Sequence, residues 1–204
     1  MKRTLLSTSL YLSVCCTAHA APTLLTSAAD SSLAGAAVLD FNAEPLGSFT
    51  SRIFSGAATF STINNLFVEN TFAGLFAATG NYISNQTNPY PITIDFSAGV
   101  SAFGFNWGAA DQPWVLEVFD TASNPIGSFN IPAQTDPHAG FIGVNGGGLT
   151  IGYARLSNQS NYGYDYVLLD DFKFVSANQN DIPEPTSIAL LSLGVACLIR
   201  RSKA

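Results

Sequence analysis

Short apolar runs separated by turn residues recur through most of this chain, and they limit its fold more than any other feature. The runs are rich in Val, Ile, Phe, Tyr and Thr, the residue types that favour β-strands. Turn chemistry separates several of them, as at residues 124–127 and 145–148. Outside the Ala-rich segment 26–37, the body keeps no apolar residues at helical spacing for three turns. The sequence therefore predicts an all-β fold.

Eleven strands are expected in this part of the chain. They cover residues 38–41, 50–54, 57–62, 65–69, 91–96, 101–107, 114–120, 126–131, 140–144, 149–156 and 166–175. Many short strands with tight turns are typical of two antiparallel sheets packed face to face. We therefore expect a jelly-roll-like, two-sheet antiparallel sandwich in one domain at residues 38–176, preceded by an N-terminal arm at residues 21–37.

The first twenty residues have the order of a secretory signal peptide. A positively charged start precedes the uncharged, mostly apolar residues 5–16, and Ala18 and Ala20 stand at the −3 and −1 positions of a cut. A helix of those twelve residues would rise only about 18 Å, against about 30 Å for a bilayer core, which disfavours a transmembrane helix. The sequence predicts export by the Sec machinery and cleavage by signal peptidase between Ala20 and Ala21.

All three cysteines lie in the terminal segments, at Cys15, Cys16 and Cys197. The body between them therefore has no disulfide, no thiol and no cysteine metal ligand. An exported domain without disulfides depends on its hydrophobic core, with or without an ion held by oxygen ligands. We expect no cofactor, and leave only a structural calcium ion open.

The C-terminal segment, residues 182–204, differs in composition from the body, to which residues 177–181 link it. In order, it contains Pro183, Glu184, Pro185, an uncharged run at residues 186–199, Arg200 and Arg201. The prolines end any strand or helix that enters from the body, so the segment begins as a separate unit. Its apolar run would span about 21 Å as a helix, and the cations after it favour the cytoplasmic side. We expect an apolar membrane helix that holds the precursor in the inner membrane, with the body outside.

This order of parts resembles the PEP-CTERM sorting signal of exosortase substrates. The resemblance covers only the terminal segment and lies in Pro183, Glu184, Pro185, residues 188–199, Arg200 and Arg201. It implies recognition by exosortase, a membrane-embedded cysteine protease, followed by removal of the tail. It also implies delivery to the cell surface or to an exopolysaccharide matrix.

The body resembles, more loosely, the β-sandwich surface proteins that often carry such a tail. The matching segments are residues 39–41, 46–47, 100–105, 118–120 and 169–172. This resemblance implies a fold like that of carbohydrate-binding modules and no particular ligand.

The charge of the body narrows the choice of partners. Residues 21–181 carry three cationic and thirteen acidic side chains, a net charge of −10. Such a surface repels phosphate backbones, so nucleic acid is not expected as a partner. Neutral glycans and cations remain compatible with it.

Trp107 and Trp114 flank one short loop that contains Asp111. An exposed tryptophan there would stack on a sugar ring, with Asp111 accepting hydrogen bonds from sugar hydroxyls. The alternative is that both tryptophans belong to the edge of the core. The sequence favours the core interpretation, and Trp107, Trp114 and Asp111 are the candidate glycan contacts if the tryptophans are exposed.

No catalytic residue is expected in the body. Its one histidine, His138, stands beside Pro137 in an apparent loop, and no nucleophile-elbow motif is present. Glu117 and Asp120 suggest a glycosidase pair, but residues three apart point to opposite faces of a strand. The predicted function is a non-catalytic surface or matrix protein associated with exopolysaccharide or biofilm, with glycan binding left open. The alternative is an exported glycan-active hydrolase that uses acidic side chains.

Alternation in the last strand places Asp170 on the inward face. If Lys173 faces water, the face that carries Phe172 points to the core and takes Asp170 with it. A buried carboxylate needs a partner or an ion. We expect either Arg155 or a calcium ion shared with oxygens of residues 40–44, which makes Asp170 a structural carboxylate.

Overall fold

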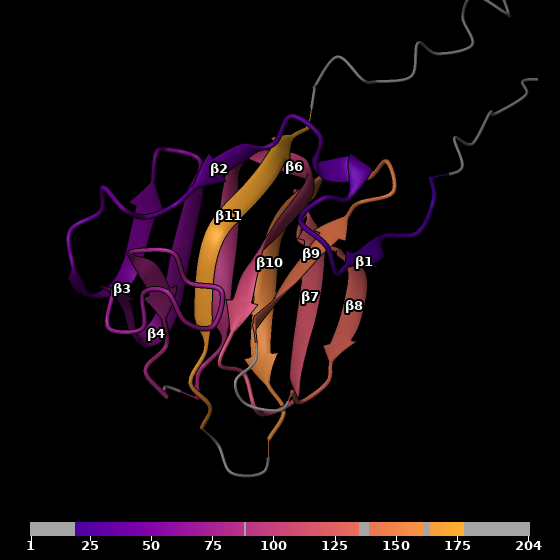
Figure 1. Cartoon of the computed structure of the whole chain (residues 1–204). Helices are drawn as coiled ribbons and strands as arrows, with labels where there is room; N and C mark the ends of the chain where they lie inside the picture. The colour runs from indigo at the N-terminus through magenta and orange to yellow at the C-terminus, as the bar shows by residue number, and fades with distance from the viewer. Residues whose placement is uncertain (1–18, 88, 135–138, 161–163, 178–204) are drawn as a thin grey trace, which may run out of the picture. The chain divides into compact units, whose positions relative to one another are not determined.

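The computed structural model of the chain describes residues 19–87, 89–134, 139–160 and 164–177 (Figure 1). Within them, eleven strands and one short 3₁₀ helix are present. The elements are β1 (Thr23–Leu25), η1 (Ser31–Leu33), β2 (Ala37–Leu39), β3 (Gly47–Phe54), β4 (Ala58–Glu69), β5 (Tyr82–Ser84), β6 (Ile92–Gly108), β7 (Trp114–Asp120), β8 (Pro125–Ile131), β9 (Ala139–Asn145), β10 (Ile151–Asn158) and β11 (Leu168–Ser176). The prediction of an all-β fold is confirmed.

Antiparallel pairing joins the strands, and β6 carries the sheet around a corner. Residues 92–96 of β6 pair with β4 and β10, whereas residues 102–108 pair with β9 and β11. Gly99 stands between the two halves at a φ of +69°, a conformation that glycine adopts without steric cost. A sandwich of two layers results. The β7 layer contains β3, β4, β6, β10, β7 and β8, and the β11 layer contains β1, β9, β6 and β11, with β2 and β5 beside β11.

The core between the layers is built from aromatic side chains around Phe172, which is fully buried. The ring centroid of Phe172 lies 5.2 to 6.1 Å from those of Phe60, Phe96, Phe103, Phe105 and Phe174. Aromatic pairs at these distances stabilise a core beyond the effect of burial alone. This cluster is the centre of a domain that has no disulfide to stabilise it.

Two pairs of predicted strands are single long strands in the structure. The expected strands at 57–62 and 65–69 are parts of β4, and those at 91–96 and 101–107 are parts of β6. Two short strands, β1 and β5, were not expected at all. β1 lies inside the predicted arm, where it pairs with β9 through Leu24 and Val144.

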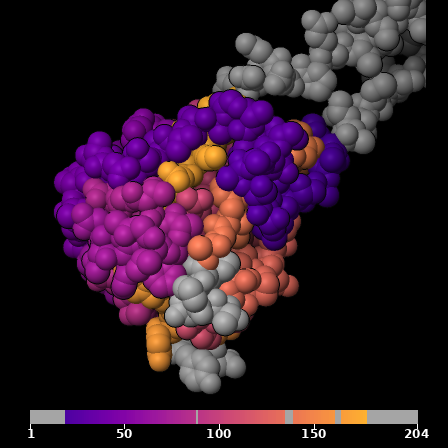
Figure 2. All heavy atoms as spheres, viewed as in Figure 1, coloured from indigo at the N-terminus to yellow at the C-terminus, as the bar shows by residue number. Residues whose placement is uncertain are grey.

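Two irregular segments cover the outer face of the β11 layer. One is the N-terminal arm, whose Leu25 and Leu33 form a small apolar cluster with Ala102 of β6. The other is the β4–β5 connection, residues 70–81, which carries Ala78 onto Leu168 of β11. In Figure 2 the arm is indigo, the connection is magenta, and yellow atoms of β11 show between them.

Both ends of the described body lie at one end of the sandwich, here called the near end (Figure 1). The amide of Ala177 donates to the carbonyl of Gly99, at the corner of β6, over 3.3 Å. The carbonyl of Ala20 lies against Gly147 in the β9–β10 turn. The opposite end, called the far end, carries the β5–β6, β6–β7 and β10–β11 connections.

None of the helical structure in the described residues is long and apolar enough to cross a membrane. The apolar helix predicted for residues 182–204 lies outside the described residues, as does most of the predicted signal peptide.

Candidate functional site

The residues predicted for signal cleavage stand immediately before the first strand. Ala20 and Ala21 are exposed, and β1 begins at Thr23. The predicted sorting residues Pro183, Glu184, Pro185, Arg200 and Arg201 lie outside the described residues, and so does His138.

The two predicted glycan-contacting tryptophans are buried. Trp107 is 0% and Trp114 is 1% exposed, and their rings meet edge to face with centroids 5.5 Å apart. Trp107 lies near the end of β6 and Trp114 begins β7, and both strands turn their indoles into the space between the layers. Neither ring offers a face to a sugar, so the alternative of tryptophan stacking is wrong and the favoured interpretation, that both rings belong to the core, is confirmed. Asp111 is exposed, and its carboxylate accepts a 3.1 Å hydrogen bond from the side chain of Gln112.

Asp170 is buried, but its surroundings differ from those predicted. Its carboxylate accepts hydrogen bonds from the Thr79 amide at 2.8 Å, the Thr79 hydroxyl at 3.1 Å and the Asp171 amide at 2.7 Å. Burial raises the pKa of Asp170, against the effect of these donors. Asp170 therefore fixes the β4–β5 connection, which contains Thr79, onto the outer side of β11.

A bulge explains why the predicted strand phase is wrong. Asp171 has a φ of +46°, and the pairing of β11 with β6 shifts between Asp170 and Lys173. A bulge of this kind changes the face on which the following side chains lie. Leu169 before the shift and Phe172 after it both belong to the main core. Asp170 therefore does not share a face with Phe172.

Arg155, one of the two expected partners of Asp170, is engaged elsewhere. Arg155 instead donates from Nε and Nη2 to Glu117 Oε2, over 3.0 and 2.7 Å. The described residues contain no group of three or more His, Cys, Asp or Glu side chains that could hold a metal ion. The printed partners of Asp170 are thus Thr79 and the Asp171 amide, and not Arg155.

The acidic pair considered for hydrolysis is engaged in structural contacts. Glu117 forms the ion pair with Arg155, directly across from it on β10. Asp120 accepts hydrogen bonds from the Ala122 amide at 2.9 Å and from the Asn124 amide at 2.8 Å, which closes the β7–β8 turn. The two carboxylates thus have separate structural roles.

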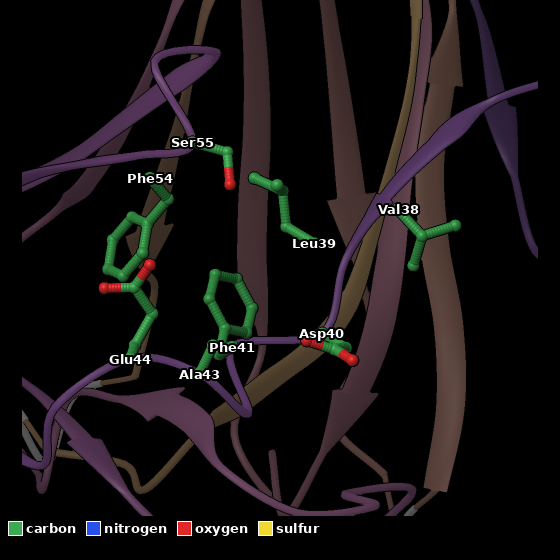
Figure 3. Close-up of a pocket in the computed structure, with 8 residues that line it drawn as sticks. All are labelled: Val38, Leu39, Asp40, Phe41, Ala43, Glu44, Phe54 and Ser55. Carbon is green, nitrogen blue, oxygen red and sulfur yellow. The ribbon is translucent and has the colours of Figure 1, made fainter.

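A small hollow opens where the β2–β3 connection meets the end of β3 (Figure 3). Its volume is about 90 Å³, and it is lined by Val38, Leu39, Asp40, Phe41, Ala43, Glu44, Phe54 and Ser55. Figure 3 shows the Phe41, Leu39 and Phe54 side chains in its wall, while Asp40 and Val38 point away from it. Sites for small organic ligands are typically several hundred Å³, so this hollow suits a few water molecules rather than a sugar.

A larger groove lies at the far end, between the bend of β4 and the β5–β6 connection. Its volume is about 320 Å³, and its lining consists of Asn64, Asn65, Phe67, Asn85, Gln86, Thr87 and Pro89. Every one of these side chains is uncharged, and five of them carry an amide or a hydroxyl group. This is the candidate functional site, called the amide groove below.

A hydrogen-bond network fixes the wall of the amide groove. Glu69 accepts hydrogen bonds from the hydroxyls of Ser84 and Tyr166, and from Gln86 Nε2 at 2.8 Å. Gln86 and Thr87 have φ values of +42° and +66°, a region that residues other than glycine rarely adopt. Such backbone strain persists only where the surroundings hold it, and it concentrates at functional sites.

Asn85 secures the other side of the same loop. Its Nδ2 donates to the Asp165 carbonyl at 2.8 Å, and its Oδ1 accepts from the Val167 amide at 3.0 Å. The loop that lines the amide groove is therefore attached both to β4, through Glu69, and to the start of β11.

Asp165 itself was not singled out in the sequence. It is buried, and its carboxylate accepts hydrogen bonds from Trp114 Nε1 at 2.6 Å, the Gln112 amide at 3.3 Å and the Asp111 amide at 3.4 Å. Burial raises the pKa of Asp165 to about 6, against the opposing effect of the Trp114 hydrogen bond. Its contacts join segments more than fifty residues apart, so no local pattern indicates them.

The terminal segment matches a known family. Residues 181–203 match the model of the PEP-CTERM protein-sorting motif, which confirms the resemblance found in Pro183, Glu184 and Pro185. Among curated proteins, no relative matches the chain.

Solved structures of sugar-binding and adhesin domains are similar to the body at low identity. TmCBM61 in complex with β-1,4-galactotriose is 15% identical, with a TM-score of 0.42, over 59% of this chain and 88% of that chain. A cleaved adhesin domain of Lys-gingipain from Porphyromonas gingivalis is 13% identical, with a TM-score of 0.40, over 66% and 98%. A mutant family 29 carbohydrate-binding module complexed with mannohexaose is 10% identical, with a TM-score of 0.38, over 74% and 97%. At these values the likenesses carry no argument about ligand or activity.

Proposed function

We propose that this chain, which ends in a PEP-CTERM sorting motif, is an exosortase-sorted protein of the cell surface or extracellular matrix that binds a neutral glycan without catalysis. Export would use the Sec machinery and signal peptidase, and exosortase would process the tail. The exopolysaccharide of the matrix is the proposed ligand. The observation that carries the binding role is the uncharged, amide-lined groove at the far end of the sandwich.

The chemistry of the amide groove suits sugars. Amide and hydroxyl side chains both donate and accept hydrogen bonds, as the hydroxyls of a sugar do. Phe67 and Pro89 add apolar surface, against which the C–H faces of a sugar ring would pack. The body carries a net charge of −10, which disfavours a polyanionic ligand and leaves a neutral one acceptable.

The lining also supports a binding role rather than a hydrolytic one. It contains no carboxyl, thiol or imidazole group. Glycoside hydrolysis commonly needs two carboxyl groups on either side of the scissile bond. The nearest carboxylate in the network, Glu69, is engaged by Ser84, Tyr166 and Gln86.

Replacement of the groove amides should weaken glycan binding. We expect Asn64→Ala and Gln86→Ala each to lower affinity by roughly 2- to 12-fold, because each removes a hydrogen-bonding group worth about 0.5–1.5 kcal/mol. A glycan array on the mature protein would identify the ligand, and titration calorimetry would measure the variants. Asn130→Ala, an exposed amide on β8, is the matched control and should bind like the wild type.

Two outcomes would count against this function. One is a mature protein that binds no glycan on the array. The other is release of reducing ends from glycan substrates, which would favour the hydrolase alternative.

Removal of the tail should abolish sorting without affecting the fold. A chain that stops after Asp181 should keep its β circular dichroism and unfold cooperatively, because two prolines separate the tail from the body.

The full chain should be processed in the envelope, and its exported form should begin at Ala21 by mass spectrometry. Loss of cooperative unfolding in the truncated chain, or a retained Met1 in exported material, would contradict this prediction.

A further inference from the structure

Glu69, the last residue of β4, accepts hydrogen bonds from three side chains that come from three different segments. The hydroxyls of Ser84, at the end of β5, and of Tyr166, before β11, both donate to its Oε1. The side-chain Nε2 of Gln86, in the β5–β6 connection, donates to its Oε2 over 2.8 Å. Gln86 is one of the residues that line the amide groove. One carboxylate therefore connects the sheet to a side chain of the candidate site.

The neighbours of Glu69 make its carboxylate an acceptor only. Burial raises the pKa of Tyr166, and the hydrogen bond to Glu69 raises it further, so the phenol keeps its proton and donates. Ser84 is fully buried, and its hydroxyl is directed to the same carboxylate oxygen. An ionised carboxylate has no hydrogen to donate, so only the NH₂ group of the Gln86 amide can face it.

This contact orients the whole amide of Gln86. The oxygen and the nitrogen of a side-chain amide lie on opposite sides of one carbon atom, so an Nε2 held at Glu69 turns Oε1 away from it. The backbone is held as well, because Gln86 and Thr87 have φ values of +42° and +66°. Such strained conformations persist only where the surrounding structure fixes them. The amide is therefore oriented before any ligand arrives.

We propose that Glu69 is a positioning residue of the amide groove, which fixes Gln86 so that its carbonyl oxygen faces the ligand. A carbonyl oxygen only accepts hydrogen bonds, so the ligand must bring a donor to this point. The ligand class is then a neutral glycan with a free hydroxyl or an acetamido N–H at the contact, and an O-methyl or O-acyl group there is rejected. The proposal rests on the proposed function for its ligand, but the orientation of Gln86 is measured without one.

The substitution Glu69→Gln reverses this orientation with almost no change in shape. The new amide would keep its oxygen for the hydroxyls of Ser84 and Tyr166 and would turn its NH₂ group toward Gln86. Gln86 would then offer its own oxygen in return and present its NH₂ group to the ligand. The groove would therefore show the ligand a donor in place of an acceptor.

NMR on the ligand-free mature protein measures the orientation. In the wild type, one side-chain N–H of Gln86 is bonded to a carboxylate and should resonate downfield of an ordinary glutamine amide. In Glu69→Gln, this signal should move to the range of an ordinary amide. Glu44→Gln, the same change in the β2–β3 connection, is the matched control and should leave it in place. An unchanged Gln86 signal in Glu69→Gln would overturn the positioning role.

The selectivity is measured on an array of galactose, mannose and glucose oligosaccharides, each printed unmodified and with one hydroxyl O-methylated at a time. At one position, O-methylation should lower wild-type affinity by roughly 2- to 12-fold, because it leaves the Gln86 carbonyl without a donor. In Glu69→Gln the loss at that position should disappear, since a methylated oxygen still accepts a hydrogen bond. Losses at the other positions should be the same in both proteins.

The double variant Glu69→Gln/Gln86→Glu separates orientation from damage to the fold. It exchanges the two groups, so the amide at position 69 can accept from Ser84 and Tyr166 and donate to the carboxylate at position 86. The second oxygen of that carboxylate is again an acceptor for the ligand. Discrimination against the O-methylated sugar should therefore return.

The outcomes of the two measurements are distinguishable. Equal discrimination in the wild type and in Glu69→Gln, or no recovery in the double variant, would overturn the proposal. If no oligosaccharide binds while the Gln86 signal responds to Glu69→Gln and not to Glu44→Gln, the fixed orientation of Gln86 is supported and the proposed function fails.

Discussion

Replacement of Phe172 by alanine should lower the free energy of unfolding by about 3–5 kcal/mol. The side chain is fully buried, and its ring contacts five other phenylalanine rings between the two layers. The substitution would remove these contacts and leave a cavity that rigid neighbouring strands fill only in part. Domains of this size are stable by about 5–15 kcal/mol, so the variant would lose a large share of its stability.

Chemical denaturation of the mature protein measures this effect, with Phe119→Ala as the matched control. Phe119 lies on the outer face of the β7 layer, half-buried and stacked on Tyr153 with centroids 4.4 Å apart. The same Phe→Ala change should lower the free energy of unfolding much less at Phe119 than at Phe172. Equal losses of unfolding free energy in the two variants would show that Phe172 is not the centre of the core.

Asp170→Ala should lower the free energy of unfolding by about 3 kcal/mol, the second largest effect that we expect. The change deprives the Thr79 amide, the Thr79 hydroxyl and the Asp171 amide of their acceptor. Buried donors left without a partner cost about 1–3 kcal/mol each, and release of the burial penalty of the carboxylate offsets part of that. Thermal and chemical unfolding would both report the loss.

The control for Asp170 is Asp95→Ala. Asp95 is exposed on β6, and partial desolvation raises the pKa of its carboxyl group, so replacing it should change the free energy of unfolding little. A chelator should leave the melting temperature of the wild type unchanged, since the donors of Thr79 and Asp171 already satisfy the Asp170 carboxylate. A melting temperature that falls on chelation would instead indicate a metal ion bound at Asp170.

The strands of this body were predictable where their pattern is local. The expected strand at 114–120 coincides with β7, because its residues are mostly β-branched, aromatic or aliphatic and stand between clear turn signals. The merging of strands in β4 and β6 was not predictable, because the bends carry glycine and polar residues that otherwise mark loops. β1 and β5 are three residues each, too short for a periodic signal, and their pairing partners determine them.

The burial of Trp107 did have a signal in the sequence. Phe103, Phe105 and Trp107 are two residues apart, so they share one face of a strand, and all three are buried. Extending that alternation to Trp107 favours the core over a sugar platform. The phase of Asp170 had no such signal, because a single bulge at Asp171 changes the face within one strand.

The amide groove could not be predicted from the sequence. Asn85 and Gln86 stand in an ordinary polar segment, and their role depends on contacts with Asp165 and Glu69. Such contacts form only when β4, β5 and the start of β11 are adjacent in the fold.

The position of the chain ends has a mechanical consequence. The tail leaves the body after Ala177, at the near end, whereas the amide groove lies at the far end. A pull between an attached C-terminus and a held glycan would therefore run along β11. The hydrogen bonds of β11 to β6 and β2 would then be loaded together in shear, instead of being opened one after another from a free edge. A surface protein attached in this way would resist traction through the ladders that β11 forms with β6 and β2.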